Sequence, residues 1–231
     1  MENTNTNIVS ETNSGLSAFM TGVYGWMFGG LTLTAIIAYF FASSSALMVI
    51  AMNPIIFWGI AIAELGLVFY LSARIAKLSS QKATTLFGIY AALNGIFFST
   101  IFILYTGTSI ASAFLSTALM FGVLAIYGYT TKRDLTSIGH LALAGLVGII
   151  LASLVNIFLG NAGINAAINY LGIIVFLALT AYDNQKIKAM YLGYAGDQET
   201  LKKLAILGAL TLYLDFINLF LDLLNIFGSR K

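Results

Sequence analysis

The chain has 231 residues, of which 59% are hydrophobic and only 9% are charged. An ordinary soluble domain carries about a quarter charged residues, so this chain has too little charge to cover a water-facing surface. A single proline excludes collagen, and the absence of cysteine excludes a disulfide scaffold, a thiolate zinc site and an iron–sulfur cluster. The net charge of +2 argues against nucleic-acid binding. The composition therefore predicts an integral membrane protein.

The N-terminal stretch 1–17 (MENTNTNIVSETNSGLS) is polar and lacks the basic start of a signal peptide, so we expect a retained cytoplasmic tail. Residues 18–231 then form one transmembrane domain. A membrane helix needs about 20 apolar residues, and seven segments meet this length. The predicted spans are Ala18–Phe41, Pro54–Ala73, Ala83–Tyr105, Ile110–Thr130, Gly139–Leu159, Ile164–Tyr191 and Leu204–Phe227. Such long, nearly charge-free segments predict an all-α fold with seven transmembrane helices rather than barrel strands.

Basic residues fall in alternate loops, which predicts the orientation. Nine of them lie in the loops after the second, fourth and sixth spans: Arg74, Lys77, Lys82, Lys132, Arg133, Lys186, Lys188, Lys202 and Lys203. The other three loops hold none. By the positive-inside rule the N-terminus is cytoplasmic, and an odd number of spans places the C-terminus outside, against the weaker opposing signal of Arg230 and Lys231.

Four acidic residues lie inside the predicted spans: Glu64, Asp183, Asp215 and Asp222. An intramembrane charge is costly and usually marks a function. Asp215 is close to the middle of the last span, and Asn218 and Asp222 follow three and seven residues later, so the three share one polar stripe. A single stripe on an apolar helix favours a central position for that helix. The plainer alternative is a protonated Asp215 that hydrogen-bonds to a neighbouring helix.

Whether Asp183 meets Asp215 depends on where the sixth span ends. If it ends at Lys186, Asp183 is about 5 Å deep, whereas a helix that runs to Tyr191 or Leu192 places it about 12 Å deep and within reach of Asp215. Two adjacent carboxyls share a proton and offer a weak, hydrated site for calcium. The alternative for Asp183 is a helix-end carboxylate paired with Lys186 or Lys188.

The second and third spans supply three further candidates. Arg74 follows Glu64 by ten residues, nearly three turns, and lies near the cytoplasmic end, where it could reach the aspartate pair as an electrostatic latch. Its alternative role is a positive-inside anchor. Asn94, in the segment NGIFFST, is a neutral oxygen donor along the ion path or a hydrogen-bonding group between helices.

Four segments resemble the transmembrane Bax inhibitor motif family, and in particular its bacterial members. They are ELGLVFYLSARI (64–75), NGIFFST (94–100), AYDNQKIKAMY (181–191) and LYLDFINLFLDLL (212–224). The resemblance implies seven helices with the last one enclosed by the other six, in a bacterial cytoplasmic (inner) membrane. It also implies a calcium leak that is gated by pH.

In that family two aspartates on the last two spans form the pH sensor, and an arginine on the second span locks one of them. The matching positions are Asp183, Asp215 and Arg74, while Glu64 matches an acidic position of the same span. Asp222 stands where an apolar residue is expected, so it is either an extra ligand or a local peculiarity.

The sequence thus predicts a non-enzymatic, pH-sensitive calcium or cation leak. Asp183, Asp215 and Arg74 form its gate, and Glu64, Asn94, Asn218 and Asp222 are candidates for the ion path. We expect no tightly bound cofactor, with calcium as the permeant ion, and the lipid bilayer, calcium ions and protons as partners.

Three other functions remain open. An intramembrane aspartyl protease would match at Tyr182-Asp183, but Tyr213-Leu214-Asp215 lacks the second, glycine-containing half of that signature. A proton-coupled transporter could use the same carboxyls. A non-conducting regulator of a membrane-bound protease could make its contact through the acidic tail 1–17.

Overall fold

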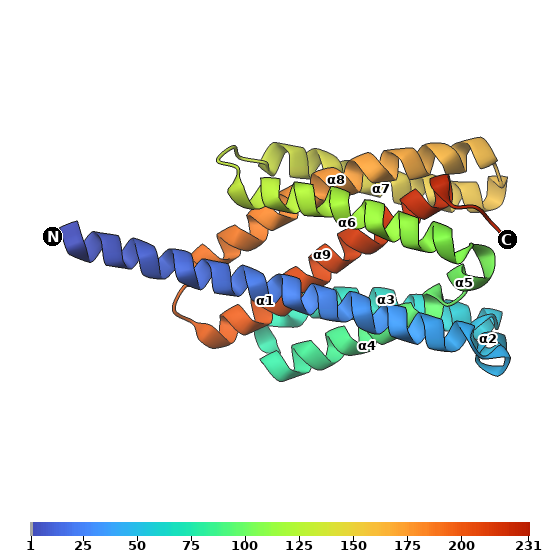
Figure 1. The fold of residues 1–231 in the computed structure, drawn as a ribbon, viewed down its shortest axis with the longest axis horizontal. Coiled ribbons are helices and arrows are strands. Elements are labelled where there is room, and N and C mark those ends of the chain that lie inside the picture. The colour runs from blue at the N-terminus through green and yellow to red at the C-terminus, as the bar shows by residue number, and fades with distance from the viewer. Residues whose placement is uncertain (1) are drawn as a thin grey trace. The chain divides into compact units, whose positions relative to one another are not determined.

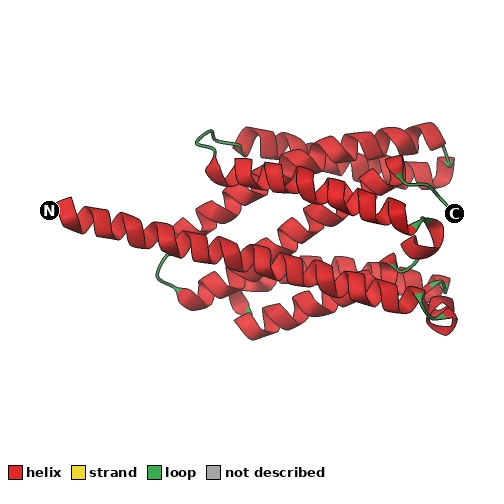
Figure 2. Ribbon diagram, in the orientation of Figure 1, coloured by secondary structure: helices red, strands yellow, loops and turns green. Residues whose placement is uncertain are grey.

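The fold is known from a computed structural model, which describes the backbone of residues 2–231 and the side chains of residues 14–231. Helices make up almost all of this part of the chain (Figures 1 and 2). The helices are α1 (Glu2–Ala42), α2 (Ser45–Ala51), α3 (Pro54–Arg74), the short 3-10 helix η1 (Ile75–Lys77), α4 (Ser80–Phe98), α5 (Ile101–Leu104), α6 (Gly107–Thr130), α7 (Thr136–Leu159), α8 (Ala162–Gly193) and α9 (Gln198–Phe227).

The seven predicted spans are confirmed, since seven helical segments within the described residues are long and apolar enough to cross a membrane. The first span lies on α1, which begins at Glu2, so the backbone of this helix continues into the stretch that the sequence predicts as a tail. The sixth runs to Gly193, past the basic residues Lys186 and Lys188. This corresponds to the longer of the two ends considered, for which the sequence predicts a deeper position of Asp183 in the membrane.

The third span is broken, although the sequence predicts one helix over Ala83–Tyr105. The helix stops at Phe98 and resumes at Ile101, so Ser99 and Thr100 lie between α4 and α5. Their hydroxyls donate to the carbonyls of Ile96 and Phe97, at 2.6 and 3.1 Å. Serine and threonine compete for backbone carbonyls in this way and bend helices, which explains the break.

Local sequence signals define most helix ends. The Asn53 side chain accepts from the N–H groups of Ile55 and Ile56 at the start of α3, where Pro54 occupies the first position and loses no helical bond. Gly160 ends α7 with a positive φ of 61°, a conformation that glycine adopts without a steric cost.

The chain divides into two compact units, which we describe separately. The first unit contains Met1–Ile103 and Ile187–Tyr213, and the second contains Leu104–Lys186 and Leu214–Lys231. The long helices α8 and α9 therefore contribute to both units, as does the short helix α5 through its last residue. The span on α9 is also the most buried of the seven, with 72% of its most apolar stretch inside the protein, against 6% for the spans on α3 and α7. Enclosure of α9 by all six other spans stays a prediction.

In the second unit, the segment after α9 is tied to the start of α6. The backbone N–H of Thr106 donates to the Ser229 carbonyl at 3.2 Å, and the N–H of Lys231 donates to the Leu104 carbonyl at 3.0 Å. The N–H of Ser229 donates to the Ser109 hydroxyl at 2.9 Å. The residues after α9 therefore lie at the same end of this unit as the loop before α6.

Candidate functional site

Two buried carboxyls from the last two helices meet in the second unit. Asp183 on α8 and Asp215 on α9 are 8% and 4% exposed, and their side chains hydrogen-bond to each other. A carboxyl–carboxyl hydrogen bond needs a proton on one of the two groups, because two carboxylates offer only acceptors. The contact that the sequence predicts for a long sixth helix is therefore present, and it is a contact that depends on a proton.

Glycines on α6 and α7 allow a close approach to α8 directly before Asp183. A Cβ added at Gly128 would lie 2.1 Å from the Ala181 carbonyl oxygen, and one added at Gly139 would lie 2.4 Å from the Tyr182 ring. Small residues let membrane helices approach closely where lipid gives no hydrophobic drive. These two contacts fix the part of α8 from which Asp183 projects.

The residues that follow Asp183 anchor α8 in two further ways. Gln185 accepts from the backbone N–H of Leu135 and donates to the carbonyl of Arg133, both at 2.8 Å, so it holds the loop between α6 and α7. Asn184 is fully buried and donates to the Thr180 carbonyl of its own helix. The motif around Asp183 thus serves packing as well as the carboxyl pair, a role that the sequence did not reveal.

Lys186 is the basic residue nearest to the pair in the second unit. It acts on Asp183 electrostatically, while its ammonium lies 5.8 Å from the centre of the Tyr182 ring. The hydrogen bond of Asp183 is nevertheless made to Asp215. Asp183 thus interacts with both Lys186 and Asp215, and the interpretation as a helix-end partner for lysine describes only one of the two interactions.

The polar stripe on α9 is only partly satisfied. Within the part of the chain whose side chains are described, the Asp215 Oδ2 and Asp222 Oδ2 atoms are buried without a hydrogen-bond partner. Asp222 packs against Gly172, where an added Cβ would lie 2.2 Å from Oδ2. Asn218 donates to the Leu214 carbonyl at 2.8 Å and is therefore engaged with its own helix. A buried acceptor without a hydrogen bond destabilises the protein. Binding of a proton, a water molecule or a cation at these carboxyl oxygens would therefore be especially favourable.

A second polar cluster lies in the first unit and contains the predicted residues Glu64 and Asn94. Glu64 of α3 lies within electrostatic range of the hydroxyls of Tyr90 and Tyr213, and its Oε1 atom is buried without a partner among the described side chains. Asn94 donates to the Tyr90 carbonyl at 3.1 Å. The rings of Tyr90 and Tyr213 pack edge to face, with centroids 5.7 Å apart.

Thr34 joins this cluster from α1 and was not predicted. Its hydroxyl lies 2.7 Å from the Tyr213 hydroxyl and donates to the Ala91 carbonyl at 2.8 Å. The three residues are far apart in sequence, and the TLT and LYLD segments contain no spacing that pairs them. Only the tyrosine beside Asp215 could have drawn attention to the site.

Arg74, the predicted latch, is the last residue of α3, belongs to the first unit and is exposed. The latch itself stays a prediction. Among the described residues no three histidine or acidic side chains gather as a metal site. Any cation at the aspartate pair would therefore keep much of its water, since calcium takes six to eight oxygen ligands.

Comparison with known proteins identifies the family. A family model described as "Inhibitor of apoptosis-promoting Bax1" matches residues 16–231. The chain is 51% identical to the inner membrane protein YbhL of Escherichia coli K12 over 225 residues, which cover 96% of both proteins. It is 42% identical over 219 residues to an uncharacterized protein of Rickettsia prowazekii, covering 95% of this chain and 92% of the relative. An uncharacterized membrane protein of Streptococcus pyogenes is 37% identical over 229 residues, covering 96% and 97%. The chain therefore belongs to the Bax inhibitor family of multi-pass membrane proteins.

Proposed function

We propose that the protein is a pH-sensitive calcium leak channel of the bacterial inner membrane. The observation that carries the proposal is the hydrogen bond between Asp183 and Asp215, two buried carboxyls on membrane-spanning helices. Such a bond exists only while the pair holds a proton, so its presence is linked to pH. The E. coli relative, an inner membrane protein, supports the location.

In the proposed mechanism the protons bias a gate. At higher pH the two aspartates ionise, Arg74 pairs with one of them, and α9 blocks the path. Acid neutralises the pair and releases Arg74, so the open population rises. Protons shift this equilibrium only by their differential affinity for the two states, and the carboxyl pair supplies that difference.

The same carboxyls suit a permeant cation. The unpaired Oδ2 of Asp215 and, two turns further along α9, that of Asp222 offer oxygen ligands without forming a complete cage. Conduction requires binding that is weak enough for the ion to leave. Glu64, Asn94 and Asn218 are the further ion-path candidates in this proposal, and the protein needs neither a catalytic step nor a bound cofactor.

Calcium flux into proteoliposomes at pH 6 and pH 8 tests the proposal. We expect faster flux at pH 6 for the parent and a loss of this pH difference in Asp215→Asn, which keeps the size and hydrogen bonding of the side chain but cannot ionise. Asp134→Asn is the matched control, because Asp134 is an exposed loop carboxylate that caps the N–H of Thr136. An Asp215→Asn variant that keeps the parent's pH difference would show that the aspartate pair is not the gate.

The latch needs its own variant. Arg74→Gln removes the charge, so we expect flux at pH 8 to rise toward the value at pH 6, while Lys77→Gln, three residues further along, leaves both rates unchanged. If Arg74→Gln and Lys77→Gln behave alike, Arg74 serves only as a positive-inside anchor.

Absence of calcium flux at both pH values in the parent would overturn the channel proposal and favour a non-conducting partner of a membrane-bound protease. Saturable, substrate-dependent uptake would instead indicate a proton-coupled transporter.

A further inference from the structure

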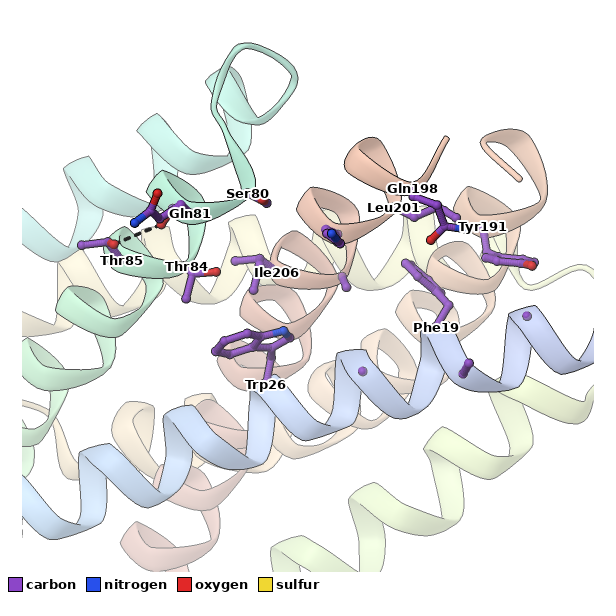
Figure 3. A pocket seen from close by; sticks show the side chains of 15 residues that line it. Phe19, Trp26, Ser80, Gln81, Thr84, Thr85, Tyr191, Gln198, Leu201 and Ile206 are labelled. Atoms are coloured by element: carbon purple, nitrogen blue, oxygen red, sulfur yellow. Dashed lines mark hydrogen bonds between the residues drawn. The ribbon is translucent and has the colours of Figure 1, made fainter. Parts of the chain in front are cut away.

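The first unit contains a cavity of about 640 Å³ that the proposed channel does not use. It is lined by residues of α1, α4, α8 and α9 (Figure 3). In the close-up, the ring of Trp26 projects from α1 toward Ile206 of α9, and Phe19 lies one to two turns away on the same helix as Trp26. A volume of this size fits an organic ligand, since ligand pockets span about 300–1,000 Å³.

One wall of the cavity is apolar and aromatic. Phe19 and Trp26 come from α1, Tyr191 from α8, and Ile206 from α9. The Phe19 and Tyr191 rings pack at 5.5 Å, and Trp26 remains 43% exposed. Tryptophan and tyrosine are enriched where a membrane protein meets the headgroup level of the bilayer. This wall therefore suits an acyl chain and the glycerol region above it.

Polar lining residues, which we call the polar wall, carry one positive charge. They include Gln81 from the first turn of α4 and Gln198 and Lys202 from the first two turns of α9. Lys202 is exposed and is the only charged residue among the described residues that line the cavity. The Gln198 amide and the Lys202 ammonium, four residues apart on α9, are donors that match a phosphate group, whereas Gln81 lies beside Thr85 on α4 (Figure 3).

The Glu199 carboxylate of the same helix acts electrostatically on Lys202 but does not line the cavity. Glu199 accepts from the backbone N–H of Ser80 at 3.0 Å and from its hydroxyl at 3.3 Å. A neighbouring lysine, Lys203, is likewise engaged and donates to the Ala76 carbonyl at 3.3 Å. Lys202 is thus the cation that an incoming anion would meet.

The position along the helices indicates where such an anion comes from. The polar wall belongs to the ends of α4 and α9 that adjoin the basic residues Lys77, Lys82 and Lys203, the ends that the positive-inside rule places at the cytoplasmic leaflet. We propose that the cavity binds an anionic phospholipid of that leaflet. Lys202 and Gln198 hold the phosphate, and an acyl chain lies along Phe19, Trp26 and Ile206. A free phosphate ion would leave the aromatic wall unused.

Quenching of Trp26 fluorescence by brominated lipid measures occupancy directly. The chain has two tryptophans, so Trp58→Phe leaves Trp26 as the single probe. The purified full-length protein in detergent is titrated with phosphatidylglycerol or phosphatidylcholine whose acyl chains carry bromine, without calcium. We expect saturable quenching at about fivefold lower concentration of phosphatidylglycerol, the effect of one lysine near an anionic lipid.

Two variants with matched controls define the site. Lys202→Gln should abolish the preference for phosphatidylglycerol, whereas Lys132→Gln, an exposed lysine of the second unit, should keep it. Gly22 lines the cavity, and a Cβ there meets nothing within 4 Å, so Gly22→Leu fills the space without displacing a neighbour and should remove most of the quenching. Gly25 has equal room but does not line the cavity, so Gly25→Leu should quench as the parent does.

The possible outcomes separate the sources of the anion. Equal quenching by the two lipids, or quenching that Gly22→Leu leaves unchanged, would show that the quenching comes from ordinary lipid around the protein. Either result overturns the proposal. Displacement of the brominated lipid by millimolar glycerol 3-phosphate would assign the cavity to a soluble anion and also overturn it. Because the measurement involves neither calcium nor pH, it is independent of the proposed channel.

Discussion

Tyr213 and Asp215 lie two residues apart on α9, and both are buried, with 0% and 4% of their surface exposed. Their hydrogen bonding differs. The single hydroxyl proton of Thr34 goes to the Ala91 carbonyl, so the Tyr213 hydroxyl donates to Thr34, and this chain of bonds is complete. Asp215 hydrogen-bonds to Asp183, and its buried Oδ2 atom has no other partner among the described side chains.

We infer from this difference that Tyr213 is a structural polar group and propose a functional role for Asp215. A satisfied buried hydroxyl stabilises a fold and specifies which helices pack together, whereas an unsatisfied buried carboxyl costs stability and persists where function requires it. We therefore expect substitutions around Tyr213 to change stability and substitutions at Asp215 to change pH-dependent activity.

The largest effect should come from displacing α8 beneath the carboxyl pair. In Gly128→Ala the new Cβ would meet the Ala181 carbonyl oxygen, a backbone atom that cannot rotate away, and we expect a loss of about 3 kcal/mol or more. Gly122→Ala on the same helix meets nothing within 4 Å and should be neutral or slightly stabilising. Thermal unfolding of both variants in detergent measures the contrast, and equal stability would show that α6 does not position Asp183.

The Thr34–Tyr213 pair should show an asymmetry between its two partners. Thr34→Val leaves the Tyr213 donor unsatisfied and should cost about 1–3 kcal/mol, whereas Tyr213→Phe removes that donor and should cost about 0.5–1.5 kcal/mol. A double-mutant cycle on the free energy of unfolding gives the coupling. If Tyr213→Phe were the more damaging change, the direction of the hydrogen bond would be the reverse.

Asp215→Asn should change stability less than Thr34→Val does, by about 1 kcal/mol or less, because the amide can still bond to Asp183. The same variant is the one expected to abolish the pH difference in calcium flux. A loss of stability that exceeds the cost of Thr34→Val would remove the distinction between the two residues.

The smallest effect concerns the start of α9. The hydroxyl and backbone N–H of Thr200 hydrogen-bond to Asp197 and lower the pKa of that exposed carboxyl. A lowered pKa in the folded state means that the stabilisation is present above the unfolded pKa of about 3.9 and is lost as pH falls through the folded value. Asp197→Ala should therefore lower Tm slightly at pH 7 and by less at pH 3, while Asp197→Asn, which keeps an acceptor, should show a smaller decrease at pH 7. A decrease of Tm that is equal at both pH values would contradict this linkage.

Helix number and extent could be predicted because they depend on length and polarity along the chain. The meeting of Asp183 and Asp215 could be predicted only conditionally, since it required α8 to continue past Lys186 and Lys188. Lysine side chains can extend toward the interface while the backbone remains helical, and α8 does run to Gly193. The residues alone did not decide between the two ends.

Other features depend on contacts that sequence spacing does not encode. Thr34 and Tyr213 are separated by 179 positions, and neither has a neighbour that identifies the other. The break after Phe98 arises where two hydroxyls bond to carbonyls one turn earlier, although the hydropathy of the segment continues through it. Side-chain competition for backbone groups is local, but its outcome depends on the surrounding packing.

The ties between the segment after α9 and the loop before α6 limit how α9 can move. A piston-like displacement along its own axis would break the Thr106–Ser229 and Lys231–Leu104 backbone bonds together with the bond between the Tyr105 hydroxyl and Asn225. Bending of α9 nearer Asp215 would preserve them. In the proposed channel the far end of α9 therefore serves as a pivot, and a change of protonation at the carboxyl pair has a tilt of the helix, rather than a slide, to act upon.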